Sequence, residues 1–118
     1  MKPDCAATIF HVSDVESSIQ YYTNVLGFVV DFRYNDFAGL EFGPILIYLS
    51  GPAQGVKRII GQGAIYIFCD EVDQYFQEVS GNGAIVEVNI DNRDYGMRDF
   101  GVKDLDGNAL SFGTKSEN

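Results

Sequence analysis

The stretch HVSDVESSIQYYTNVLGF, residues 11–28, decides the fold because it holds a whole helix with both ends marked. Ser13 and Asp14 carry short side-chain oxygens that can accept the unpaired amides of a helix start. Gly27 suits the end, because glycine takes the left-handed conformation there without penalty. Between them the apolar residues recur with helical spacing, at Val15, Ile19, Tyr22 and Leu26.

The second half of the chain repeats this plan. EVDQYFQEV (71–79) shares with DVESSIQYY (14–22) the order acidic, valine, acidic, followed by apolar residues at the same helical offsets. Asp70 and Glu71 supply the polar start of this second helix. An apolar strand precedes each helix, AATIFHV (6–12) and AIYIFC (64–69). The repetition predicts two copies of one structural unit.

Three strand-like runs follow each helix, with turn residues such as Asp91-Asn92 between them. The runs are FVVDFRY (28–34), FAGLEF (37–42) and ILIYLS (45–50), then AIVEVNI (84–90), MRDFGV (97–102) and NALSFG (108–113). The 118 residues suit a single domain. We therefore predict an α+β fold of two βαβββ modules, about 5–50 and 63–114, joined by a glycine-rich linker, 51–62. Their apolar sheet faces would curl as a mixed sheet around a shared cavity.

Composition excludes several classes of partner. The chain has 17 acidic and 8 basic residues, a net charge of -9, which repels nucleic-acid backbones. No apolar run approaches the length of a membrane span, and Asp4 interrupts the region that a signal peptide would need. Cys5 and Cys69 match neither a zinc nor a disulfide pattern. We expect a cytoplasmic protein with reduced thiols that binds neither nucleic acid nor membrane.

Two signatures resemble one known family. The segment 11–28 is similar to the helix entry of the vicinal-oxygen-chelate superfamily, which includes glyoxalases, bleomycin-resistance proteins and extradiol dioxygenases. The ending YGMRDFGVKDLDGNALSFG (95–113) resembles its C-terminal strand–turn–strand signature, with Leu105 in place of the usual proline. With the internal repeat, the resemblance covers almost the whole chain and implies the fold predicted above.

The resemblance also implies four metal-ligand positions, and these carry unsuitable residues. They fall on Ala7, Tyr48, Ala64 and Ser111. Hard divalent ions need carboxylate or imidazole donors, which these residues lack. His11 shares the strand face of Ala7 but lies four residues further along. The chain thus most resembles the metal-free bleomycin-resistance proteins. This resemblance implies that the protein has no metal or other cofactor and forms a homodimer. It also implies that the dimer sequesters an aromatic, in some cases cationic, small molecule and so confers antibiotic resistance.

Strand alternation from the former ligand positions gives the residues expected to face the cavity. Phe37 and Tyr95 stand where the metal-free proteins have aromatic residues, and Asp99, Asp36 or Glu41 could supply a countercharge. We predict no catalytic residue. The predicted ligand-binding residues are His11, Phe37, Tyr48, Tyr66, Phe68, Tyr95, Asp99 and Ser111.

Two other functions remain open from the sequence. One is a glyoxalase-like lyase or isomerase with a rebuilt site, using His11, Tyr48 or Tyr66 as acid–base groups. The other is a dimerising or regulatory module whose cavity is filled by side chains. Tyr66 and Phe68 would then be plain sheet core, and Tyr95 a loop aromatic. The sequence leaves open the ligand, and whether two chains would pair side by side or exchange modules.

Overall fold

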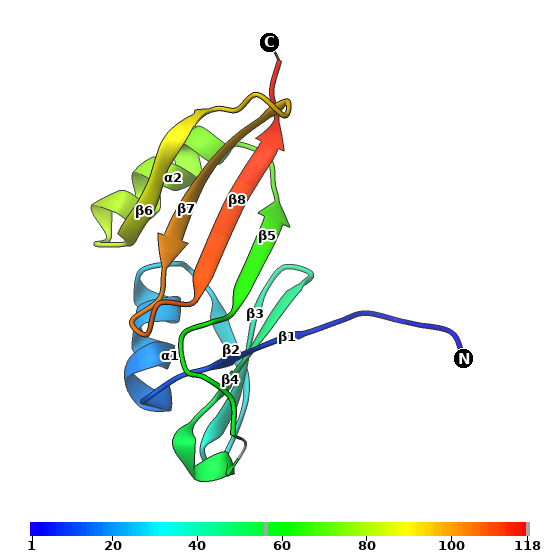
Figure 1. Cartoon of the computed structure of the whole chain (residues 1–118), viewed down its shortest axis with the longest axis vertical. Helices are drawn as coiled ribbons and strands as arrows, with labels where there is room; N and C mark the ends of the chain where they lie inside the picture. Colours follow the sequence, from blue (N-terminus) through cyan, green and yellow to red (C-terminus); the bar gives the residue numbers. More distant parts are fainter. Residues whose placement is uncertain (56, 118) are drawn as a thin grey trace.

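The computed structural model describes residues 1–55 and 57–117, which form two sheets with one helix on each (Figure 1). The first module contains β1 (Thr8–His11), α1 (Val15–Asn24), β2 (Val29–Tyr34), β3 (Phe37–Phe42) and β4 (Ile45–Ser50). The second contains β5 (Ala64–Phe68), α2 (Val72–Gly81), β6 (Ile85–Asn92), β7 (Met97–Lys103) and β8 (Ala109–Lys115). The predicted α+β fold of two βαβββ modules is confirmed. A short 3₁₀ helix (Pro52–Gln54) lies in the linker.

The two sheets have the same topology. Their strand orders are β1-β4-β3-β2 and β5-β8-β7-β6, and in each the first two strands are parallel while the other pairs are antiparallel. The register pairs Ile9 with Tyr48 in the first sheet and Tyr66 with Ser111 in the second. Equivalent positions of the two modules therefore lie at equivalent places in the two sheets.

The ends of the first helix form as its sequence predicts, and two second-module details differ. Asp14 Oδ1 accepts the amide of Ser17 at 3.0 Å. Glu71, in contrast, takes the left-handed region at φ 45° and makes no side-chain cap, so the expected polar cap of α2 is absent. The turn expected at Asp91-Asn92 is also wrong, because β6 continues through these residues. The chain instead reverses over 93–96, where Gly96 has φ 86° and the Arg93 amide donates to the Met97 carbonyl at 2.7 Å.

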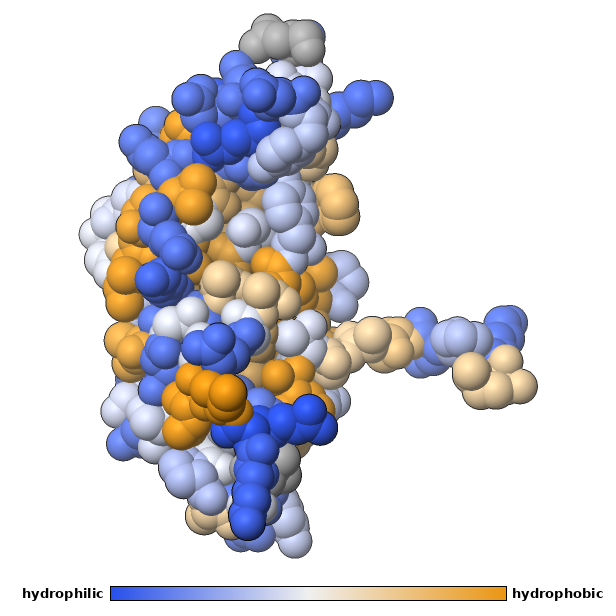
Figure 2. Space-filling model, in the orientation of Figure 1, coloured by the Kyte–Doolittle hydropathy of each residue, from blue (hydrophilic) through white to orange (hydrophobic). Residues whose placement is uncertain are grey.

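Each sheet has one covered and one open face. The helices cover the face that carries Leu40, Leu49 and Leu110, all fully buried. Residues at alternate positions point the other way, and several are large and exposed, including Ile9, Tyr66 and Phe68. Apolar side chains accordingly reach the surface over both modules (Figure 2). No helix of residues 1–55 and 57–117 is long and apolar enough to cross a membrane.

Hydrogen bonds from the α1 tyrosine pair hold the modules together. The hydroxyl of Tyr22, which is fully buried, donates to Asp104 Oδ2 at 2.9 Å. The neighbouring Tyr21 hydroxyl donates to the Lys103 carbonyl at 2.7 Å and accepts the Ile85 amide at 3.0 Å. The aromatic pair of the helix signature therefore fixes α1 against the second module.

Candidate ligand-binding site

The eight predicted ligand-binding residues divide into two groups. One group lies on the open side of the first sheet and contains His11, Phe37 and Tyr48. The other belongs to the second module and contains Tyr66, Phe68, Tyr95, Asp99 and Ser111. No hydrogen bond or ring contact among the described residues joins the two groups. Neither of the two cavities considered below is lined by both open faces.

The first sheet carries a cluster of three aromatic rings on its open face. The ring of Tyr48 lies edge-on to Phe32 and Phe37, with centroid distances of 5.2 and 5.6 Å. Phe32 lies over Gly39, where an added Cβ would come within 2.6 Å of a ring carbon, Cδ2. Sequence reasoning missed Phe32. A glycine in β3 beside an aromatic residue in β2 is the signal that could have revealed it.

A shallow cavity of about 740 Å³ adjoins this cluster at one end of the sheet. Its floor includes His11, Phe37 and Ile9, and the linker forms its opposite wall. The linker contributes polar side chains to this wall: Gln54, Arg58 and Gln62. Sequence reasoning assigned no binding role to the linker, because a glycine-rich connection gives no periodic signal.

A network of hydrogen bonds on the second sheet centres on Asp99, which is 4% exposed. Its Oδ2 accepts the hydroxyls of Tyr66 at 2.8 Å and Tyr95 at 2.5 Å, and its Oδ1 accepts Arg93 Nε at 2.7 Å. Burial acts to raise the pKa of Asp99, but the bonds from Arg93, Tyr95 and Tyr66 outweigh it and hold the pKa below its usual value. Asp99 is therefore an ionised anchor for two phenols, already paired with Arg93, rather than a free countercharge.

Tyr66 reaches Asp99 because Gly113 leaves room for it. An added Cβ at Gly113 would lie 2.7 Å from Tyr66 Cζ and 3.0 Å from Asp99 Cβ. Burial and the bond to Asp99 raise the pKa of Tyr66, so this phenol stays protonated at neutral pH and is a poor general base. Tyr66 is 36% exposed, and its ring contacts that of Phe68, a residue that is 76% exposed, at a centroid distance of 5.1 Å. Such exposure does not fit the alternative that these two residues are sheet core.

The remaining predicted residue of the second sheet, Ser111, lies between the strands that carry Tyr66 and Gly101. It is half-buried, and its Oγ lies 3.6 Å from the position that a Cβ on Gly101 would take. The side chain thus lies on the open face, next to Gly101.

Asp36 and Glu41, the two other candidates for a countercharge, differ in whether their carboxylates already have a partner. Asp36 Oδ2 accepts the amide of Ala53 at 2.8 Å, so Asp36 holds the linker. Glu41 shares the open face with Phe37 and Gly39 and has no ion-pair partner within residues 1–55 and 57–117. Of the candidates, Glu41 is therefore the one whose carboxylate could pair with a cationic ligand.

The four positions at which the resemblance implies metal ligands do not fit a divalent ion. Ala7 and Ala64 offer only methyl groups, and Tyr48 and Ser111 offer a neutral phenol and a neutral alcohol. In the part of the chain that the structure describes, no three His, Cys, Asp or Glu side chains lie close enough together to hold a metal. The residues present therefore give no support for metal chemistry at this site.

Comparison with known proteins gives a consistent fold. A family model described as the Glyoxalase/Bleomycin resistance protein/Dioxygenase superfamily matches residues 6–112. No curated protein matches the sequence. Among solved structures, a glyoxalase/bleomycin resistance protein/dioxygenase from Nocardioides is 17% identical, with a TM-score of 0.83 over 100% of this chain and 87% of its own.

Two further solved structures have similar folds but different names. TioX from Micromonospora sp. ML1 is 18% identical with a TM-score of 0.82, covering 96% of this chain and 99% of its own. Lactoylglutathione lyase from Agrobacterium tumefaciens is 19% identical with a TM-score of 0.79, covering 96% of each chain. At these identities the likeness shows the shared fold alone.

Proposed function

Because this chain belongs to the glyoxalase/bleomycin resistance protein/dioxygenase superfamily, we propose that it binds an aromatic, cationic small molecule in a homodimer cleft without a metal ion. The observation that carries this proposal is the pair of phenols fixed on Asp99. Tyr66 and Tyr95 both donate to one nearly buried carboxylate, while their rings stay at the surface of the second module. Rings fixed in this way lose little conformational entropy when a ligand stacks on them.

Aromatic surface supports a planar ligand. Stacked or edge-to-face ring pairs are worth about 0.5–1.5 kcal/mol beyond the area that they bury. Tyr66, Tyr95 and Phe68 offer such surface on one module, and Phe32, Phe37 and Tyr48 offer it on the other. Ligand pockets typically combine apolar area of this kind with a few polar groups that orient the ligand.

The register of the first sheet indicates at which end of β3 the cationic group of a ligand would lie. Phe37 and Ser50 pair near His11 and Arg58, whereas Glu41 pairs with Leu46 at the other end of β3. Glu41 lies four positions after Phe37 along β3, about 13 Å away at the usual rise of a strand. A ligand cation would thus lie toward Glu41 and beside Phe32 and Tyr48, which both pair with Gly39, so that cation–π attraction adds to the ion pair.

A homodimer would complete the site. Members of this superfamily often form dimers. Within one chain the two groups of predicted residues do not touch, and the open faces expose apolar side chains, such as Ile9 on the first and Val88 on the second. Two chains that pair the first open face of one with the second open face of the other would bury these residues and enclose a ligand. Sequestering a toxic aromatic compound in the cytoplasm would then confer resistance to it.

Calorimetry with two matched probes tests this function. Ethidium is a planar aromatic cation, and phenanthridine has the same ring system without the fixed charge. We expect both to bind saturably after dialysis against a chelator, ethidium more tightly. Tyr66→Ala should weaken both at least fivefold, while Leu105→Ala, at an exposed turn residue, should weaken neither. Glu41→Gln should weaken ethidium alone.

Three results would contradict the proposal. Binding of either probe only after metal is added would show that the protein has a metal site. Probe affinity that is unchanged by Tyr66→Ala would show that the ligand does not bind at the open face of the second sheet. Chemical conversion of a bound substrate, abolished by His11→Ala, would favour the lyase or isomerase alternative.

A further inference from the structure

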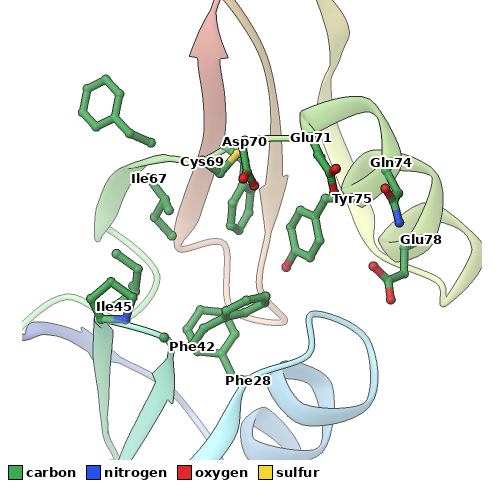
Figure 3. Close-up of a pocket in the computed structure, with 14 residues that line it drawn as sticks. Phe28, Phe42, Ile45, Ile67, Cys69, Asp70, Glu71, Gln74, Tyr75 and Glu78 are labelled. Carbon is green, nitrogen blue, oxygen red and sulfur yellow. The ribbon is translucent and has the colours of Figure 1, made fainter.

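We propose a second binding site, on the helix-covered side of the molecule, for a hydrophobic molecule that carries a protonated amine. It is a cavity of about 400 Å³ between the β3–β4 turn of the first module and the start of α2 in the second (Figure 3). This volume lies in the range of small-molecule pockets and is far larger than one buried water needs. The inference does not depend on the function proposed for the open faces.

The cavity is separate from the open-face site because it lies on the opposite side of the sheets. Ile67 and Phe112 line it, and along their strands these residues alternate with Tyr66 and Ser111 of the open face. Ile67 and Phe112 are 6% and 3% exposed, so they belong to the floor rather than the rim. Phe68, at the end of β5, is the one predicted ligand-binding residue that also borders this cavity.

A chain of aromatic rings from both modules forms the floor. Phe28, Phe42, Tyr75 and Phe112 contact one another in that order, at centroid distances of 5.4, 5.8 and 4.9 Å. The Tyr75 hydroxyl donates to the Leu26 carbonyl at 2.6 Å, which fixes this ring across the module boundary. Figure 3 shows the Tyr75 ring directed from α2 toward Phe28 and Phe42. The floor is therefore apolar and held in place before any ligand arrives.

Carboxylates make the rim negative. Asp70, Glu71 and Glu78 line the cavity, and none of their side chains has a hydrogen-bond or ion-pair partner in residues 1–55 and 57–117. The lining includes no Lys, Arg or His among the described residues. Glu71 does not cap α2, so its carboxylate is free for another partner. A protonated amine on an apolar body matches this combination of floor and rim.

The thiol that lines the cavity, Cys69, is not activated for covalent chemistry. Burial, with a smaller contribution from the Asp70 charge, raises the pKa of the Cys69 thiol. The thiolate is the reactive form, so the raised pKa lowers the reactivity of Cys69. The cavity thus acts as a reversible binding site.

Three probes with one body and different charges test the proposal by calorimetry on the full chain: 4-phenylbutylamine, 4-phenylbutanol and 4-phenylbutyrate. At low salt we expect the amine to bind several-fold more tightly than the alcohol and the carboxylate to bind most weakly. The preference for the amine should shrink in 0.5 M salt, because exposed charges are screened. Equal affinity of the amine and the carboxylate would overturn the proposal.

Substitutions at and away from the cavity rim test where the amine binds. Glu71→Gln and Glu78→Gln should each weaken the amine about two- to fivefold, as expected for exposed charges, and leave the alcohol unchanged. Glu117→Gln removes the same charge away from the cavity and should change neither. Gln74→Trp, at an exposed position of α2 on the rim, should block both probes while leaving the thermal transition in place.

Two other outcomes overturn the inference. Amine binding that survives Gln74→Trp and is lost in Tyr66→Ala would mean that the probe occupies the open face. A change of oligomeric state in Gln74→Trp, with amine affinity unaltered, would mean that the cavity wall is an interface between two copies of the chain.

Discussion

Replacing Gly113 by alanine separates the anchored tyrosine from its carboxylate. The new Cβ would lie 2.7 Å from Tyr66 Cζ, which is shorter than carbon atoms tolerate, and 3.0 Å from Asp99 Cβ, which is a tight contact. Asp99 is held by Arg93, so the Tyr66 ring has to swing away and give up its 2.8 Å hydrogen bond. A hydrogen bond to a charged group contributes about 1.5–3 kcal/mol.

The expected loss of stability is smaller than that range, because Tyr66 is 36% exposed and water compensates the lost bond in part. We expect the free energy of unfolding to fall by about 1–2 kcal/mol, which for a domain of this size lowers Tm by about 4–8 °C. Ethidium affinity should fall at least fivefold, because the ring no longer lies where the ligand stacks.

A double-mutant cycle with Tyr66→Phe, measured by urea unfolding, checks the cause. In the wild-type background Tyr66→Phe should cost about 1 kcal/mol, and in the Gly113→Ala background close to nothing, because the bond is already lost. Gly81→Ala is the matched control: an added Cβ there meets nothing within 4 Å, and alanine favours helices. Additive costs of Gly113→Ala and Tyr66→Phe, or a Tm unchanged by Gly113→Ala, would refute this account of the site.

Four further predictions concern acid stability, module packing, metals and assembly. The pKa of Asp99 is lower in the folded chain than in the unfolded one, so the contribution of Asp99 to the free energy of unfolding is complete above about pH 4–5 and is lost as the pH falls toward the folded pKa. The Tm of Asp99→Asn should therefore fall less between pH 6 and pH 2.5 than that of the wild type. An equal slope of Tm against pH in both proteins would contradict this. Tyr22→Phe removes the buried bond to Asp104 and should lower the free energy of unfolding by about 1–2 kcal/mol in urea, with no effect on phenylbutylamine binding. Titration with Ni²⁺ or Zn²⁺ should give no stoichiometric heat, and one metal per chain that disappears in His11→Ala would prove a rebuilt site. Sedimentation equilibrium should give twice the 13.1 kDa of one chain, whereas a monomer at ligand-binding concentrations would exclude a dimer cleft.

The limits of sequence reasoning are clearest in the second module. Asp99 was expected as a countercharge, since a carboxylate beside aromatic residues has that chemistry. Its neutralisation by Arg93 depends on the tight turn at 93–96, which the sequence pattern misplaced by two residues. The Asp91-Asn92 pair has good turn chemistry, but pairing with β7 kept these residues in the strand.

The sequence by itself determined the two-module βαβββ plan, because burial of one side of a helix or strand leaves a local period in the chain. It determined the bounds of β3 and β4, which are short, mostly apolar runs bounded by turn residues, and the Asp14 cap, which needs only residues three apart. These features depend on neighbours along the chain.

Only the tertiary structure decided which side chains meet. Tyr66 and Asp99 are 33 residues apart, and their bond depends on the β5–β8–β7 register and on the space above Gly113. The second cavity depends on how α2 packs beside the β3–β4 turn of the other module. Periodicity reports which face of an element is apolar, but contacts across strands and modules follow from register, twist and packing, which no local pattern records.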